Sequence, residues 1–139
     1  MIAELSIAEN NNMPCPRCGA TGALELGQLS VRGELRWFES TKCKQCGLNS
    51  EADGFGFPPE EIRNWLIKNE GRWLVKIDDV KSMVNAVKVL RLALLIDAKT
   101  ALSLLRSESK IIYSGTKGES LWLLKLLEES GELPSLLRK

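Results

Sequence analysis

The chain has 139 residues, of which 44% are hydrophobic and 27% charged, and its formal net charge is +1. The length suits one ordinary domain or two small ones, and the composition excludes a disordered chain because enough apolar surface is present to offset the entropy of folding. The small net charge argues against a general electrostatic attraction to nucleic acid or to an anionic membrane.

The first residues, MIAELSIAENNNM, have neither a basic region nor a continuous apolar run, so we expect an N-terminal tail over 1–12 and no secretory signal. The apolar stretch VLRLALLIDA contains Arg91 and Asp97 and falls well short of the roughly 18 residues that cross a bilayer. The sequence therefore predicts a soluble cytoplasmic protein with no membrane partner.

All four cysteines lie in two similar segments, CPRCG at 15–19 and CKQCG at 43–47. Paired C-x-x-C spacing in a chain without an export signal favours a metal site over a disulfide framework. Gly19 and Gly47, which follow the second cysteine of each pair, allow the backbone to turn beneath the metal. The predicted metal ligands are Cys15, Cys18, Cys43 and Cys46.

Four sulfur ligands in a chain without histidine indicate one tetrahedral Zn²⁺ ion. Iron is the alternative for four sulfurs, but it would call for a redox role that nothing else in the sequence suggests. Because the protein fills all four positions, no position is left for an activated water. The predicted zinc site is therefore structural.

Between the two cysteine pairs, alternating apolar residues on either side of Arg32-Gly33 predict a β-hairpin. Two cysteine turns joined by a hairpin resemble zinc-ribbon domains, and we assign 13–57 to such a ribbon. Zinc ribbons contact nucleic acid and protein alike, so the motif does not choose between them. Across 15–57 five basic residues are balanced by five acidic ones, which disfavours nucleic acid.

Four aromatic residues in the ribbon are candidates for partner binding. Trp37 and Phe38 are adjacent, so we expect one on the core face of the hairpin and the other on its outer face. Phe55 and Phe57 lie in the loop DGFGF, either packed locally or exposed to a partner.

A bridging helix is predicted over 58–71. Pro59 suits its first turn, and Gly71 suits its end. Ile62, Trp65 and Leu66 form an apolar stripe at helical spacing.

From Arg72 the pattern changes to that of a second domain, 72–139. RWLVKI and KIIYSG predict strands, apolar residues at helical spacing from Val80 to Leu94 predict a helix, and Asp97 caps another that ends near Leu105. The segment 116–119 is a capping box for a last helix, and SLLRK forms at most a short edge strand. The fold class is α+β: the zinc ribbon, the bridging helix and a compact β-α-α-β-α(-β) sandwich with helices on one face.

Within about 73–131, the second domain carries a pattern of apolar, charged and glycine positions: Val87, Lys88, Leu90, Arg91, Lys99, Ala101, Leu104, Leu105, Gly115, Leu124, Lys125, Leu127, Glu128, Glu129 and Gly131. In this pattern it resembles the C-terminal domain of the bacterial ribosomal stalk protein, an architecture shared with the adaptor of the Clp protease. The resemblance implies a partner-binding role for Lys88, Arg91 and Lys99. LLIDA stands where that family has a Gly-Leu-Gly loop, so we expect the fold to serve another purpose here.

The residues offer little for catalysis. Histidine is absent, and the cysteines are committed to metal. No serine lies in a nucleophile elbow, and no glycine-rich loop follows a strand and opens a helix as a phosphate-binding loop would.

The charge is distributed unevenly along the chain, with 7 Lys and Arg against 10 Asp and Glu over 1–71, and 12 against 8 over 72–139. These features predict a non-catalytic module that binds one protein partner, as a bacterial toxin-neutralising immunity protein or an adaptor. The alternative is a translation- or transcription-associated factor that contacts the ribosome, translation factors or nucleic acid.

Overall fold

The computed structural model describes residues 2–8, 14–21 and 24–139, with only the backbone of residues 2–8. The chain divides into two compact units, Met1–Gly71 with Lys117–Glu119, and Arg72–Thr116 with Ser120–Lys139. Each unit combines an antiparallel sheet with helix, which confirms the predicted α+β class. None of the helices in the described ranges is long and apolar enough to span a membrane.

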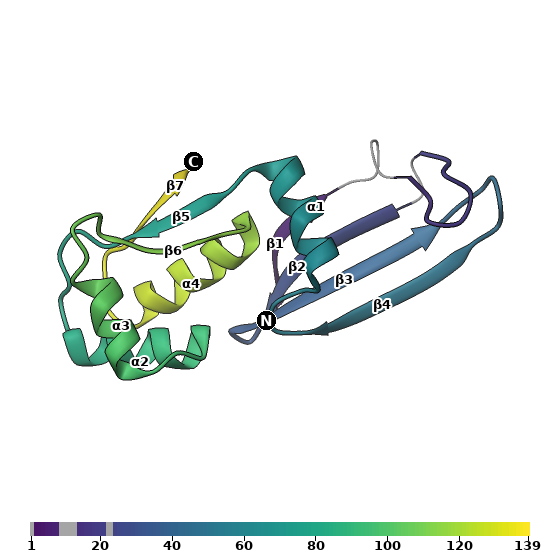
Figure 1. Ribbon diagram of the computed structural model, residues 1–139. Coiled ribbons are helices and arrows are strands. Elements are labelled where there is room, and N and C mark those ends of the chain that lie inside the picture. The colour runs from purple at the N-terminus through teal and green to yellow at the C-terminus, as the bar shows by residue number, and fades with distance from the viewer. Residues whose placement is uncertain (1, 9–13, 22–23) are drawn as a thin grey trace. The chain divides into compact units, whose positions relative to one another are not determined.

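The first unit is built on an antiparallel sheet with its strands in chain order (Figure 1). Its strands are β1 (Ile2–Ala8), β2 (Leu24–Val31), β3 (Glu34–Lys42) and β4 (Asn49–Phe55). Where we expected an N-terminal tail, residues 2–8 form β1, which pairs with β2 from Ile2↔Val31 to Ala8↔Leu26. Residues 9–12 of that tail, and Met13 at the expected start of the ribbon, lie outside the described residues.

The predicted hairpin joins β2 to β3 through Arg32 and Gly33. Val31 pairs with Glu34, so the turn has two residues, and both have positive φ, 53° and 82°. This is the primed turn whose twist matches that of the flanking strands. The turn fixes the register, which places Trp37 opposite Gln28 and Phe38 opposite Gly27.

The helix α1 (Glu60–Glu70) packs on one face of this sheet. It ends at Gly71, whose φ is 85° and whose N–H donates to the Ile67 carbonyl. The core of the unit consists of Leu24, Leu26, Ile62 and Leu66, with Trp37 and Trp65 packed against it. The helix therefore covers the sheet face that carries Trp37.

A buried ion pair adds a polar interaction to the first unit. The Glu119 side chain is fully buried and takes a bidentate contact from Arg63, whose Nε lies 3.1 and 3.0 Å from the two carboxylate oxygens. Gln28, also buried, donates to Glu119 Oε2 at 3.3 Å. A buried carboxylate is tolerated when it is paired and hydrogen-bonded in this way.

The second unit has a three-stranded antiparallel sheet in the order β6-β5-β7, with its helices on one side (Figure 1). Its elements are β5 (Trp73–Lys76), α2 (Met83–Leu94), α3 (Ala98–Leu105), β6 (Ile111–Gly115), α4 (Lys117–Glu129) and β7 (Ser135–Arg138). This order is the predicted β-α-α-β-α-β, and β7 is the expected short edge strand.

Caps and a buried carboxylate hold the helices of the second unit in place. Ser82 caps α2 by accepting from the Asn85 N–H, and Asp97 caps α3 by accepting from the Thr100 N–H at 2.8 Å. Glu132 is 2% exposed and accepts from the N–H groups of Lys81 and Ser82 at 2.7 and 3.0 Å. The loop before α2 is thereby tied to the loop after α4.

The apolar residues of α2 divide between the core and the surface. The buried residues are Ala86, Leu90 and Ala93. Val84, which falls three residues before Val87 in the sequence, is 78% exposed, and Leu92 is 71% exposed. The apolar pattern of this helix is therefore wider than its buried face.

Candidate metal centre and binding surface

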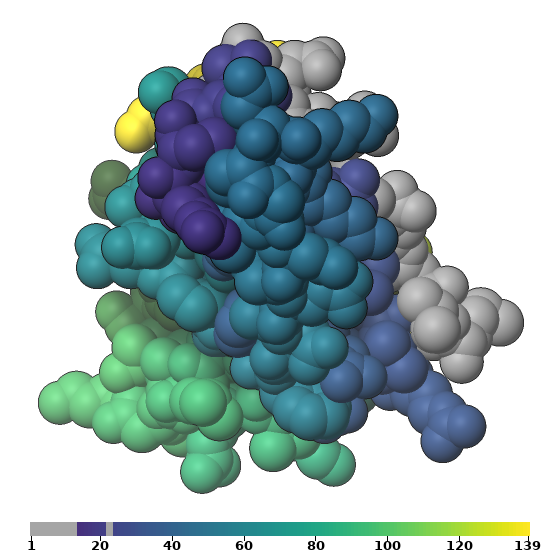
Figure 2. Space-filling view, turned by 90° about the vertical axis from the view of Figure 1, so that its right-hand side faces the viewer, coloured from purple at the N-terminus to yellow at the C-terminus, as the bar shows by residue number. Residues whose placement is uncertain are grey.

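The two cysteine segments fold into turns with the same hydrogen bonds. In the first, the N–H of Cys15 donates to Ala20 and the N–H of Gly19 donates to Cys15, at 2.7 and 2.9 Å. In the second, Cys43 donates to Leu48 and Gly47 donates to Cys43, at 2.8 and 2.9 Å. Figure 2 shows the two turns side by side, the first in purple and the second in blue.

Glycine is required at the end of each turn because the backbone is left-handed there. Gly19 and Gly47 both have φ of +78°, a conformation that L side chains rarely adopt. This matches the role expected of these glycines from the sequence. The repeated geometry shows that each C-x-x-C-G segment forms the same local turn.

The four predicted ligands come together as a set. The Sγ atoms of Cys15, Cys18, Cys43 and Cys46 all lie within 4.8 Å of one another. The Cys15–Cys46 and Cys18–Cys43 sulfurs are 3.7 and 3.5 Å apart, and all four thiols are free. Tetrahedral zinc with bonds of about 2.3 Å has sulfur–sulfur edges of about 3.8 Å, so the arrangement could hold such an ion.

The surroundings of the sulfurs also suit a cation. The Arg17 N–H points at Cys15 Sγ from 3.4 Å, in the manner of the outer hydrogen bonds that orient metal ligands. Cys15 and Cys43 are buried, whereas Cys18 is exposed. Ala20 and Leu48 pack beside the cluster.

The pKa values of the thiols differ within the cluster. The N–H of Cys18 is the main cause that lowers the pKa of Cys15 to about 6, and the N–H of Cys46 is the main cause that lowers the pKa of Cys43. The N–H of Ala20 lowers the pKa of Cys18, but burial and hydrogen bonds with Cys43 and the other two sulfurs outweigh it and raise that pKa to about 12. Four adjacent sulfurs therefore cannot all be thiolates unless a cation shares their charge.

The aromatic candidates of the first unit occupy different positions. Trp37 packs against the core and lies across Gly54 of β4, whereas Phe38 is half-buried and lies on the opposite face of β3. Phe55 is 65% exposed, with the Arg36 guanidinium 4.3 Å from its ring centre, and Phe57 is 37% exposed. The four residues therefore do not form one surface, because Trp37 belongs to the core face.

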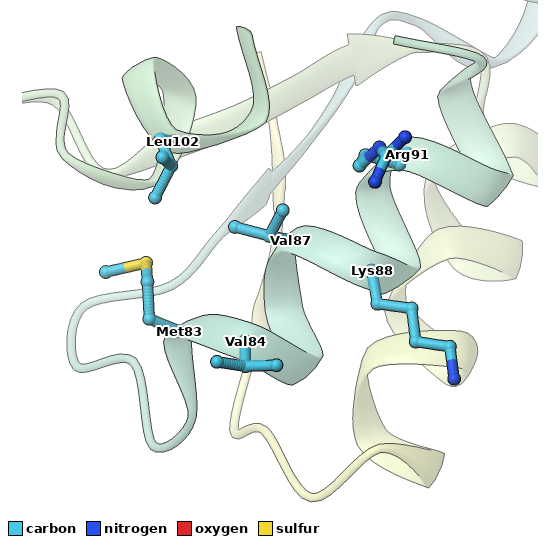
Figure 3. Close-up of a pocket in the computed structure, with 6 residues that line it drawn as sticks. All are labelled: Met83, Val84, Val87, Lys88, Arg91 and Leu102. Carbon is cyan, nitrogen blue, oxygen red and sulfur yellow. The ribbon is translucent and has the colours of Figure 1, made fainter. Parts of the chain in front are cut away.

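Two of the three basic candidates line a groove on the second unit. Its volume is about 540 Å³, and it is lined by Met83, Val84, Val87, Lys88, Arg91 and Leu102. Figure 3 shows Leu102 on α3 and the other five residues on α2. Lys99, the third basic candidate, is exposed on the first turn of α3 and does not line the groove.

Sequence reasoning missed the apolar part of this groove. Helical spacing identifies Met83, Val84 and Val87 as apolar residues of one helix, but it does not reveal that Val84 is left outside the core. The one available signal is that apolar residues surround more of α2 than a single buried face requires.

No protein-family model, no curated protein and no solved structure matches this chain.

Proposed function

We propose that the chain is a non-catalytic module that binds one protein partner and is stabilised by a structural zinc ion. The observation that carries the proposal is a set of exposed apolar side chains at α2. Val84, Leu92 and Leu95 are 78%, 71% and 85% exposed, although the interior of the same unit is well packed. Exposed large apolar side chains that gather on one helix and its end favour a protein-binding site.

The cysteine cluster supports a structural role for the metal. All four ligands come from the chain itself, so the centre has no open position for a substrate or a water. Tetrahedral sulfur coordination suits zinc and iron alike, and zinc is preferred because nothing else in the chain suggests the redox role that iron would serve. The metal then stabilises the fold of the first unit and takes no part in a reaction.

Among non-catalytic modules, we favour a bacterial toxin-neutralising immunity protein or an adaptor. Both classes act by binding a single partner, and the unequal charge of the two chain halves gives the electrostatic contrast that steers such encounters. An adjacent gene for a secreted toxin would support the immunity role.

Affinity purification from native lysate, with and without nuclease treatment, tests this proposal. We expect one stoichiometric protein, retained after nuclease treatment and lost with Leu92→Asp, but retained with Lys125→Glu on another helix. Expression of the retrieved protein in a host should arrest growth, and co-expression of the chain should restore it if the role is immunity. Retrieval of RNA in place of a protein would contradict the proposal.

Lys88 and Arg91 favour one alternative, a factor that contacts the ribosome or the transcription machinery. Both side chains are exposed, and no ion pair engages either of them within the described residues. In that case the chain should co-sediment with ribosomes at moderate salt, and Lys88→Glu with Arg91→Glu should abolish this. Absence from the ribosomal fraction would exclude it.

A further inference from the structure

We propose that the groove between α2 and α3 binds an acidic amphipathic segment of a protein, with apolar side chains in the groove and Asp or Glu beside them. This rests on the proposed function that the chain binds a protein, and it specifies the surface and the chemistry of the bound segment. The groove lies within the second unit, whose elements α2 and α3 pack against each other.

The floor of the groove is apolar. Met83 and Val87 of α2 and Leu102 of α3 are half-buried, and Val84 is largely exposed at its edge (Figure 3). The volume of about 540 Å³ lies within the range of ligand-binding clefts and admits more than one apolar side chain. Covering these residues would remove apolar surface from water, which is the main favourable term in association.

The positive charges lie on the same helix. Lys88 and Arg91 line the groove and are three residues apart, so they are neighbours on the helix surface. The ion pairs of the second unit's described part, Lys76–Asp78 and Lys81–Asp79, involve neither of them. The positive charge of Arg91 acts on the carboxylate of Asp97. That carboxylate already accepts a hydrogen bond from the Thr100 N–H as a helix cap.

One face of α2 carries an exposed apolar residue followed by two basic ones. Val84, Lys88 and Arg91 fall at i, i+4 and i+7, which is one stripe along the helix, and the exposed Leu95 follows at its C-cap. A complementary segment would place apolar residues near Val84 and Leu95 and carboxylates between them. Carboxylates pair with Arg in bidentate fashion and with Lys as a point charge.

Leu95 is an unusual residue for this C-cap. It lies in the left-handed region, with φ of 56° and ψ of 42°, and it is 85% exposed. This backbone conformation is strained for leucine, whereas glycine adopts it without strain. Strained positions are found at binding sites more often than elsewhere, which agrees with a role for the leucine side chain in contact with a partner.

An acidic protein segment fits this surface better than nucleic acid does. Binding to nucleic acid relies on several phosphate contacts, whereas this groove presents two cations on an apolar floor. A basic segment would bring like charges together at Lys88 and Arg91. The apolar floor and the cations together select a partner with both apolar and acidic side chains.

Titration of the isotope-labelled full chain with two synthetic amphipathic peptides, followed by NMR, tests this proposal. The peptides share their apolar residues, with Glu in one and Lys in the other at all charged positions. We expect the Glu peptide to bind at least about tenfold more tightly than the Lys peptide, which corresponds to the free energy of roughly one charge-assisted contact. Its binding should shift the amide signals of α2 and α3. Equal binding of both peptides, no binding of either, or shifts confined to other elements would overturn the proposal.

Charge reversal provides the matched variants. Lys88→Glu with Arg91→Glu should invert the preference so that the Lys peptide binds better, whereas Lys125→Glu with Lys139→Glu changes the net charge equally and should leave it unchanged. All four side chains are exposed, so both variants should fold, and a thermal melt of each checks this. If the control pair changes the preference as much as the groove pair, or if a uridine oligonucleotide displaces the Glu peptide, the groove is not selective for an acidic protein segment.

The two proposals can fail separately. A lysate partner that binds the Lys88→Glu, Arg91→Glu variant as well as it binds the wild type would refute the groove and keep the protein-binding function. Selective binding of the Glu peptide by a chain that retrieves only RNA from lysate would support the groove and refute the function.

Discussion

Cys18 is the most exposed of the four clustered cysteines, and its replacement tests the proposed metal centre at a single sulfur atom. Cys18→Ser should reduce the bound metal to less than one ion per chain and unfold the turns of the first unit, because metal-binding energy is folding energy at such sites. Thr21→Ser, at an exposed neighbouring position, is the control. Metal analysis and a thermal melt measure both effects, and a variant that keeps the metal and the melting curve would show that Cys18 is not a ligand.

Gly54 is required by the Trp37 side chain. A Cβ atom at Gly54 would lie 2.6–2.8 Å from three atoms of the indole, closer than real Cβ contacts. Gly54→Ala should therefore destabilise the first unit by roughly 1–3 kcal/mol, as overpacking does, whereas Glu51→Ala on the same strand should change stability little. Urea unfolding measures both.

A second variant shows whether the clash is the cause of this loss. In a Trp37→Leu background most of the cost of Gly54→Ala should disappear, since the indole is gone. The same cost in both backgrounds would mean that Gly54 is needed for another reason.

Leu92 and Leu95 are both exposed, yet the structure predicts opposite effects for the same substitution. Leu92 lies within α2, so Leu92→Gly should destabilise the second unit by about 1 kcal/mol. Leu95 is left-handed, so Leu95→Gly should relieve strain and stabilise it by about 1 kcal/mol. Denaturant unfolding compares the two, and equal destabilisation by both would contradict the left-handed conformation of Leu95.

The cap of α3 predicts a dependence of stability on pH. Hydrogen bonds from the Thr100 side chain and its N–H, and then the charge of Arg91, hold the pKa of Asp97 below its usual value. A carboxylate with a lowered folded-state pKa adds stability above its unfolded pKa of about 3.9 and loses it as the pH falls through the folded value.

Asp97→Asn keeps the cap and removes the charge. The wild type should be the more stable of the two at pH 7, and the difference should vanish as the pH falls below about 3.9. Thermal melts between pH 7 and pH 2.5 measure this, and a difference that does not change with pH would refute the electrostatic role of Asp97.

Across the whole molecule, the features that the sequence predicts well are those set by neighbouring residues. The spacing within each C-x-x-C-G segment, the Arg32-Gly33 turn and the Asp97 cap involve contacts within a few residues, and the structure has each of them. The cysteine cluster is also predicted, because two identical local turns leave few other ways to satisfy four sulfurs.

Features that depend on distant residues escape sequence reasoning. The strand β1 forms where a tail was expected, because its pairing with β2 is not visible in its own residues. Glu119 has the spacing of a capping box, yet its carboxylate pairs with Arg63, 56 positions away. The groove at α2 depends on which apolar residues of that helix remain uncovered, and helical spacing alone does not determine this.

X-ray absorption spectroscopy of the purified chain is the most direct measurement of the proposed metal centre. We predict one zinc ion per chain, surrounded by four sulfur atoms at about 2.3 Å. A nitrogen or oxygen ligand in the first shell, or an iron ion in place of zinc, would contradict a closed structural zinc centre built from Cys15, Cys18, Cys43 and Cys46.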